Sequence, residues 1–500
     1  LTRQLDSRFR GKDGMFAQMP LPPVIANWFE AKHWHLRAHQ RAMLDAAQRG
    51  DDALLVAATG AGKTLAGFLP ILADLIENPV EGLHSLYVSP LKALAVDVRR
   101  NLETPIAEMG LPIRVETRTG DTPSDRKARQ RARPPHILLT TPESLSLLLS
   151  YPEAETLFAN LRTVVIDEVH AFAPTKRGDL LSLSLARLQR LAPAMRRVAL
   201  SATVADPDEY LRWLGGGVLV EGEPGAEPDI AILLPEGRIP WSGHAGSYAV
   251  PQVMAEIETH RTTIVFCNTR ALAELLFQQL WAANDLKLPI AIHHGSVAIE
   301  ARRKVEQAMA DGKLRALVAT ASLDLGVDWG DVDLVVQMGA PKGSSRMLQR
   351  IGRANHRLDT PSEAVLVPGN RFEYLEARAA LDAIAEGELD NEVFRPGGLD
   401  VLAQHIMALA CAGPLDERDL LAEIRSASPY HDIDAGTLDR VLNFIATGGY
   451  ALKAYDRFQR LARAADGGWR LAHPRFAQQH RLNAGIIVEA PMLDVRFRNG

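Results

Sequence analysis

The stretch that decides the fold is Ala57-Ala58-Thr59-Gly60-Ala61-Gly62-Lys63-Thr64, which joins a short apolar run at 53–57 to a helical pattern. Glycines let such a loop curl, so that its backbone N–H groups and the helix N-terminus cradle phosphate groups. The lysine then reaches the outer phosphates, and the threonine hydroxyl binds Mg²⁺. Ala57 replaces the first glycine of the general pattern, and an ordinary glycine-rich turn is the alternative. The preceding strand and the following helix favour phosphate binding.

A second stretch, Thr163-Val164-Val165-Ile166-Asp167-Glu168-Val169-His170, ends an apolar strand in two acids. Ligands bind at the carboxyl ends of the strands in open α/β sheets, so both carboxylates are expected at that edge. Asp167 can hold Mg²⁺ through water, while Glu168 can orient or deprotonate an attacking water. Two acids after a strand also occur at ordinary helix N-termini, but their pairing with the phosphate loop favours nucleotide hydrolysis.

Short β-branched runs alternate with longer helical patterns through most of the chain, which is typical of parallel α/β sheets. The first series lies at 53–57, 86–89, 137–140, 163–166 and 197–200. A segment rich in glycine, proline and glutamate at 215–228 separates it from a second series at 263–266, 290–293, 316–319, 334–336 and 364–367. Three helical patterns follow at 399–411, 416–426 and 434–447, and they predict a winged-helix module.

The composition narrows the class of protein. At roughly 150 residues per domain, 500 residues are too many for one domain. The hydrophobic fraction of 47% and the charged fraction of 23% exclude a disordered tail, a collagen and a disulfide-stapled miniprotein. Two cysteines, Cys267 and Cys411, cannot build a cysteine-based zinc or iron–sulfur site, and they favour a reducing compartment. The apolar stretch 65–76 is broken by Asp74 and falls short of the ~18 residues of a membrane span.

Basic residues gather between 340 and 358, where five occur and no acid. Arg346, Arg350, Arg353 and Arg357 follow one another at spacings of 4, 3 and 4, which predicts one helical face. A solvated face is the alternative. Like charges on one face repel each other, however, and this favours an anionic partner such as a nucleotide phosphate or a nucleic-acid backbone. Because the net charge of the chain is −5, affinity for nucleic acid must come from local patches of this kind.

Taken in order, these motifs resemble those of superfamily 2 helicases. The resemblance extends to Gln40, SPLKAL at 89–94, TTPES at 140–144, SAT at 201–203, VFCNTR at 265–270, the stretch 320–328 and QRIGR at 349–353. A finer resemblance to the large helicase-related family rests on 89–97, 119–122, 293–296 and 349–357. Asn355 and the stretch 368–373 are most similar to the ligase-associated DExH-box branch of that family.

The resemblance implies an α/β fold of two tandem RecA-like lobes, with ATP and Mg²⁺ bound between them, followed by a winged-helix domain and the start of a further domain. Lys63, Asp167, Glu168 and Arg353 are implied as catalytic residues, with Arg353 as an arginine finger. Thr64 and Asp167 would hold the metal. The implied nucleotide contacts are Gln40 for adenine, Asp328 for ribose or lobe contacts, and Thr59, Gly60, Ala61, Gly62, Lys63, Thr64, Arg350 and Arg353.

One position departs from the related DEAD-box pattern, which expects a second arginine three residues after Arg353. His356 stands there, so Arg350, Arg357 or neither supplies the second positive charge.

A nucleic-acid strand is implied as the partner, bound through backbone amides and small hydroxyls that contact phosphate without reading bases. The residues implied in strand contact or in coupling to ATP are Pro90, Lys92, Gly120, Asp121, Thr141, Pro142, Glu143, His170, Ser201, Thr203, Thr269, Arg270 and Thr320.

The implied function is an ATP-dependent helicase or translocase that moves 3′ to 5′ on single-stranded or tailed DNA in the cytoplasm. A link to DNA repair, with a ligase or nuclease as protein partner, follows only from the family. A remodeller of RNA or RNA–DNA hybrids stays open. A non-enzymatic nucleic-acid-binding scaffold is the other alternative, and the intact Lys63, Thr64, Asp167 and Glu168 argue against it.

The expected domains are an N-terminal extension at 1–14, the ATP-binding lobe at 15–235, the second lobe at 236–390, the winged helix at 391–480 and the start of a truncated further domain at 481–500.

Overall fold

The computed structural model describes residues 21–483 except 203, 235–238, 243–245, 324–331, 356–360, 391–392, 450–451, 453–454, 456–457 and 466. The extension expected at 1–14 lies outside the described residues, as does most of the expected further domain. Of the latter, 481–483 form the end of the last helix. Within the described part, no helix combines the length and apolar character needed to cross a lipid bilayer.

The first lobe is built on a seven-stranded parallel sheet in the order β3-β4-β2-β5-β6-β1-β7. Its strands are β1 (Ala53–Val56), β2 (Ser85–Val88), β3 (Val115–Arg118), β4 (Ile137–Thr140), β5 (Thr163–Ile166), β6 (Arg196–Ser201) and β7 (Val218–Glu221). Its helices are α1 (Pro23–Ala31), α2 (Ala38–Arg49), α3 (Lys63–Glu77), α4 (Lys92–Glu108), α5 (Ser124–Ala132), α6 (Pro142–Leu149), α7 (Ala154–Phe158), α8 (Lys176–Leu191) and α9 (Pro207–Leu214).

Both faces of this sheet are covered, because successive side chains of a strand point to opposite sides. Leu55 and Val165 belong to the core shared with α1–α4. Their neighbours Leu54 and Val164 belong to the core shared with α6–α9. Burial on both faces explains why the central strands are apolar at nearly every position. This packing holds the carboxyl ends of β1 and β5 close together, because only β6 lies between these two strands.

The second lobe has a six-stranded parallel sheet in the order β10-β11-β9-β12-β13-β8. Its strands are β8 (Asp229–Ile232), β9 (Thr263–Cys267), β10 (Ile290–His293), β11 (Ala316–Ala319), β12 (Leu334–Met338) and β13 (Glu363–Val367). Its helices are α10 (Val250–Thr259), α11 (Arg270–Ala282), α12 (Ile299–Ala310), α13 (Ser344–Ile351) and α14 (Arg371–Glu386). Two buried clusters, one on each face, make it a second complete α/β layer structure.

The segment between the lobes differs from the expected boundary. β8 lies within the range expected for the first lobe, but it pairs with β13 at the edge of the second sheet. The stretch expected to separate the two α/β units also contains β7, which pairs with β1. The chain therefore passes from one sheet to the other between β7 and β8, before residue 235.

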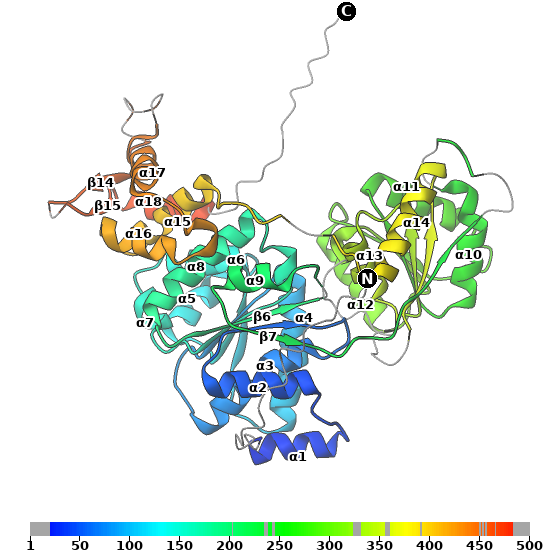
Figure 1. Ribbon diagram of the computed structural model, residues 1–500, viewed down its shortest axis with the longest axis horizontal. Coiled ribbons are helices and arrows are strands. Elements are labelled where there is room, and N and C mark those ends of the chain that lie inside the picture. Colours follow the sequence, from blue (N-terminus) through cyan, green and yellow to red (C-terminus); the bar gives the residue numbers. More distant parts are fainter. Residues whose placement is uncertain are drawn as a thin grey trace, which may run out of the picture.

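The last part of the chain forms a small helical module with a two-stranded antiparallel sheet. Its elements are α15 (Leu399–Ala412), α16 (Glu417–Arg425), α17 (Ala435–Thr447), β14 (Leu461–Arg463), β15 (Trp469–Leu471) and α18 (Arg475–Asn483). Figure 1 shows this module above the first lobe, beside α8 and α6, with the second lobe to the right.

Helix α8 belongs to two cores at once. Leu181, Leu185 and Leu188 pack under the sheet of the first lobe. Leu180 and Leu183, on another face of the helix, pack with α15 and α16 of the small module. A helix that is apolar on two faces is buried on both sides. Helix α8 thus joins the module to the first lobe. The predicted α/β class, two parallel-sheet lobes followed by a small helical module, is confirmed.

Candidate active site

The loop 57–62 lies between β1 and α3. Gly60 and Gly62 each have φ of 78°, a left-handed backbone that glycine adopts without strain. Lys63 is the first residue of α3, and its Nζ donates to the carbonyl oxygens of Ala57 at 2.9 Å and Ala58 at 3.0 Å. Burial lowers the pKa of Lys63, while Glu168 and Asp167 act to raise it. An ammonium held inside a glycine loop at a helix N-terminus is suited to bind phosphate oxygens.

Helix α2 packs beside this loop. His39 Nε2 and the carbonyl oxygen of Ala61 lie 3.0 Å apart. The side-chain nitrogen Nε2 of Gln40 lies 3.1 Å from the position that a Cβ atom on Gly62 would occupy. Because that contact is tight and the backbone there has a positive φ, position 62 requires glycine. Gln40 thus borders the loop, and its role in adenine recognition stays a prediction.

Asp167 and Glu168 lie directly after β5, at the carboxyl edge of the sheet. One oxygen of Asp167 accepts a hydrogen bond from the Tyr87 hydroxyl, and the other accepts from the backbone N–H of Glu168 at 3.0 Å. Burial raises the pKa of Tyr87 and the charge of Asp167 adds to this effect, while the side chain of Thr64 acts to lower it. The Tyr87 hydroxyl thus lies near both Asp167 and Thr64.

The two neighbouring carboxyl groups have opposite pKa shifts. Burial raises the pKa of Asp167, and the charge of Glu168 adds to that effect. Burial acts in the same direction on Glu168, but the charges of His170, Lys63 and Arg353 outweigh it, and the pKa of Glu168 is lowered. Two neighbouring acids whose pKa values are shifted in opposite directions can take different roles in a reaction. Glu168 stays ionised and able to accept a proton.

Glu168 also has an unusual backbone, with φ of 48°. A non-glycine residue in this region costs free energy and persists only where the surrounding structure holds it. His170 follows in a short 3₁₀ turn; its Nε2 lies 3.5 Å from the Glu168 carboxylate, and its Nδ1 lies 3.1 Å from Ser201 Oγ at the end of β6. This chain of contacts joins the acids to Ser201. Thr203, the other residue predicted to couple ATP to the strand, lies outside the described residues.

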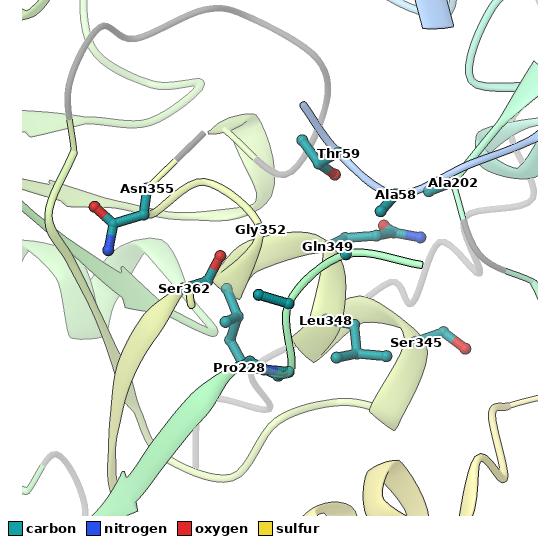
Figure 2. A pocket seen from close by; sticks show the side chains of 13 residues that line it. Ala58, Thr59, Ala202, Pro228, Ser345, Leu348, Gln349, Gly352, Asn355 and Ser362 are labelled. Atoms are coloured by element: carbon teal, nitrogen blue, oxygen red, sulfur yellow. The ribbon is translucent and has the colours of Figure 1, made fainter. Parts of the chain in front are cut away.

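The second lobe reaches the loop through the end of α13. A Cβ on Gly352 would stand 3.1 Å from Thr59 Oγ1, so the two lobes touch at this point. Figure 2 shows the adjoining cavity, with Ala58 and Thr59 on one side and Gln349 and Gly352 on the other. Arg353 follows directly, is 5% exposed, and adds its positive charge to the surroundings of Lys63, Glu168 and His170.

The prediction that four arginines share one helical face is wrong. Helix α13 ends at Ile351, and the N–H groups of Arg353 and Ala354 bond to carbonyls three residues earlier, at 3.0 and 2.9 Å, so the chain turns more tightly than an α-helix. Arg346 is exposed on α13, whereas Arg353 lies in the turn. Arg357 and His356 lie outside the described residues.

Arg350 points into the second lobe. Its guanidinium donates to Gln337 Oε1 at 2.6 Å and lies over the Phe266 ring at 4.8 Å. Neither contact is with the phosphate loop. Among the described arginines of 340–358, it is Arg353 whose charge acts on Glu168. Asp328, predicted to contact ribose or the other lobe, lies outside the described residues.

A divalent cation fits the donors of this site. Mg²⁺ prefers hard oxygen ligands, takes only one or two from the protein, and receives others from phosphate and water. The Thr64 hydroxyl and the Asp167 carboxylate, both near the Tyr87 hydroxyl, form such a sparse oxygen set. Among the described residues, no group of three or more His, Cys, Asp or Glu side chains that could hold a metal ion is found.

The residues predicted to contact the strand in the first lobe follow β2, β3 and β4, at the same edge of the sheet. Lys92 Nζ pairs with Asp121 at 2.7 Å, and both side chains are exposed. Lys127 donates to the carbonyl of Gly120 at 2.9 Å. Thr141 caps the N-terminus of α6, where Pro142 is the first residue, by accepting from the N–H of Ser144 at 3.4 Å.

The second lobe places its predicted strand contacts after β9 and β11. Thr269 caps α11 by accepting from the N–H of Leu272 at 3.2 Å. The next residue, Arg270, donates to Ser296 Oγ at 2.9 Å. Thr320 follows β11 and is 9% exposed. Strand binding by these residues stays a prediction.

Two residues of the site escaped the sequence analysis. Tyr87 lies within an apolar strand, so its position in the sequence is typical of a core residue. The one signal that could have identified it is its hydroxyl, because a buried tyrosine hydroxyl needs a hydrogen-bond partner. Arg177, in the first turn of α8, contacts both Pro90 and Glu143. Its neighbours Lys176 and Gly178 give no pattern that singles it out.

Comparison with known families gives three successive matches. Residues 37–210 match the DEAD/DEAH box helicase model, 248–357 match the helicase conserved C-terminal domain, and 382–500 match the winged helix domain of the large helicase-related protein.

Two helicases are similar in sequence to most of this chain. The Lhr helicase/probable uracil glycosylase of Mycolicibacterium smegmatis is 35% identical over 94% of this chain and 35% of its own length. The ATP-dependent helicase Lhr-Core protein 2 of Thermococcus barophilus is 37% identical over 86% of this chain and 53% of its own length. The chain therefore spans from a third to about half the length of these relatives.

A solved structure of the Mycobacterium smegmatis helicase Lhr, bound to ssDNA and AMP-PNP, superposes with a TM-score of 0.85 at 35% identity, covering 94% of this chain and 63% of that one. The DNA-bound helicase MrfA superposes with a TM-score of 0.75 at 23% identity, covering 92% of this chain and 64% of that one, which shows a shared fold.

Substitutions at two residues should affect ATP binding and ATP hydrolysis separately. Lys63→Ala should weaken ATP binding roughly 10- to 100-fold, because a charge-assisted contact of about 1.5–3 kcal/mol is lost. Glu168→Gln should keep ATP bound but slow turnover roughly 10²- to 10⁴-fold, because the amide cannot accept a proton from water. Titration with a fluorescent ATP analogue and a phosphate-release assay measure the two effects. A Glu168→Gln protein with near-normal turnover would contradict the role given to Glu168.

Proposed function

The chain belongs to the large helicase-related family, and from that premise we propose that it is the motor part of an ATP-dependent nucleic-acid helicase. The observation that supports this most is the position of Arg353. It comes from the second lobe, yet its charge acts on Lys63 and Glu168 of the first. A nucleotide site made from two lobes links hydrolysis to the distance between those lobes.

The proposed mechanism assigns each residue a task. Lys63 and the loop N–H groups bind the outer phosphates, and Glu168 takes the proton of the attacking water. Thr64 and Asp167 would hold Mg²⁺, which supplies charge neutralisation at the phosphates when bound. Arg353 stabilises the charge that develops on the transferred phosphoryl group, and it can do so only while the lobes are together.

Movement along a strand follows from the same closure. Strand contacts on the first lobe, after β2, β3 and β4, and on the second lobe, after β9 and β11, shift relative to each other whenever the lobes open and close. His170 and Ser201 connect the acids to β6, which provides a route from the state of the nucleotide to the lobe surface. Closure in one state and opening in the other would ratchet the strand.

The proposed substrate is single-stranded or tailed DNA, translocated 3′ to 5′, with a role in DNA repair and with a repair ligase or nuclease as partner. The ligase-associated branch is the proposed subfamily. The named Mycobacterium structure holds single-stranded DNA, which favours DNA over the alternatives of RNA and RNA–DNA hybrid. Backbone contacts through small hydroxyls do not by themselves distinguish these strands.

Unwinding of tailed duplexes tests this function directly. We expect ATP-dependent strand separation on 3′-tailed DNA, little on 5′-tailed DNA, and ATPase activity that rises when single strand is added. Affinity for the strand should fall steeply as salt rises and depend little on base sequence, because phosphate contacts dominate. Faster unwinding of RNA or hybrid duplexes would replace the DNA assignment. Salt-insensitive, sequence-specific binding without strand-stimulated ATPase would contradict a helicase altogether.

The arginine finger has a test of its own. Arg353→Ala should lower strand-stimulated turnover roughly 10³-fold, as loss of an arginine finger does in other phosphoryl-transfer enzymes. ATP affinity should change little, because Lys63 and the loop remain. The matched control is Arg346→Ala, which removes an exposed arginine of the same segment from within α13. If Arg346→Ala loses turnover and Arg353→Ala does not, the finger is wrongly assigned.

A further inference from the structure

The first turn of α8 contacts two loops that are far apart in the sequence. Arg177 Nε donates to Glu143 Oε1 at 2.7 Å, and its terminal nitrogen donates to the carbonyl oxygen of Pro90 at 2.7 Å and to Glu143 Oε2 at 3.3 Å. Pro90 follows β2, and Glu143 lies in the first turn of α6. One guanidinium therefore connects the segments after β2 and β4.

The ion pair of Arg177 with Glu143 neutralises a carboxylate at the surface predicted to bind the strand. Glu143 is about three-quarters buried, with its side chain 28% exposed, and Arg177 is 29% exposed. Burial would raise the pKa of Glu143, but the hydrogen bonds and charge of Arg177 lower it, so the carboxyl group stays ionised and paired. An ionised carboxylate without such a partner would repel the phosphates of a strand.

The turn that carries Arg177 is anchored from its other side. Lys176 Nζ pairs with Asp400 of α15 at 2.8 Å, and Asp179 accepts from the N–H of Gly398 at 3.0 Å. Thr175 caps the helix by accepting from the N–H of Arg177 at 3.2 Å. These contacts fix the backbone from which the guanidinium extends. The planar fork of arginine then holds two partners in one geometry, which a lysine cannot do.

We propose that Arg177 is a positioning residue for strand binding: it holds the Pro90 and Glu143 segments at a fixed separation, with the carboxylate turned away from the strand. The inference rests on the proposed function, because it concerns the same strand surface. Within the described part of the chain, Arg177 contacts neither the phosphate loop nor Asp167 and Glu168, so its effect belongs to strand affinity and not to the chemical step.

The test is strand-stimulated ATPase as a function of the concentration of single-stranded DNA. Arg177→Ala should raise the half-saturating DNA concentration at least tenfold, while turnover at saturating DNA changes less than twofold. Arg177→Lys keeps the charge but offers one ammonium in place of the fork, and its half-saturating concentration should lie between those of Arg177→Ala and the wild type. Thermal unfolding of each variant checks that the first lobe is folded.

Arg190→Ala is the matched control, because Arg190 lies at the other end of α8 and pairs with the exposed Asp419 of α16. It should leave the half-saturating DNA concentration unchanged. An Arg177→Ala value within twofold of the wild type would overturn the inference. If Arg177→Ala does not fold, Arg177→Lys decides: at least a threefold rise supports the inference, and a wild-type value overturns it. A wild-type protein without any strand stimulation would instead contradict the proposed function.

Discussion

Two positive and two negative side chains must come together across a cleft before this site is complete. Lys63, Asp167 and Glu168 belong to the first lobe, and Arg353 belongs to the second. In water such charges interact weakly, but Asp167, Glu168 and Arg353 are each less than a tenth exposed, and electrostatic interactions strengthen away from solvent. The sheets, the loop after β1 and the tight turn after α13 place these four groups at one site, where we propose that the nucleotide binds.

Helix α8 connects the first lobe, which carries three of these four groups, to the winged helix. Leucines on two of its faces pack into the first lobe and into the winged helix, so these two parts form one buried unit. Its first turn also holds the segments after β2 and β4 through Arg177. The second lobe touches this unit where Gly352 approaches Thr59. The proposed closure would therefore move the second lobe relative to the first lobe and the winged helix together.

The sequence predicted the parts of the fold that are apolar and central. The strands expected at 137–140, 163–166 and 316–319 have the bounds of the interior strands β4, β5 and β11, because burial on both sheet faces leaves continuous apolar runs. The edge strands β3, β7 and β8, which pair on one side only and keep polar residues, were not predicted. The fourth edge strand, β10, was predicted at 290–293, because its run Ile-Ala-Ile is apolar. The prediction that four arginines share one helical face was wrong because spacing defines a face only within a helix, and α13 ends at Ile351. Tyr87 and Arg177 act through partners distant in sequence, which no local pattern reveals.

The distance between the lobes is the quantity on which the whole account depends. Spin labels can be placed at Gln48→Cys on α2 and Ala379→Cys on α14, both exposed, since the natural Cys267 and Cys411 are buried. With a non-hydrolysable ATP analogue and single-stranded DNA together, the labels should show one narrow distance distribution. Without either ligand, the distribution should be broader and longer, and Arg353→Ala should weaken the narrowing. An identical distribution in all states would contradict a site completed by lobe closure.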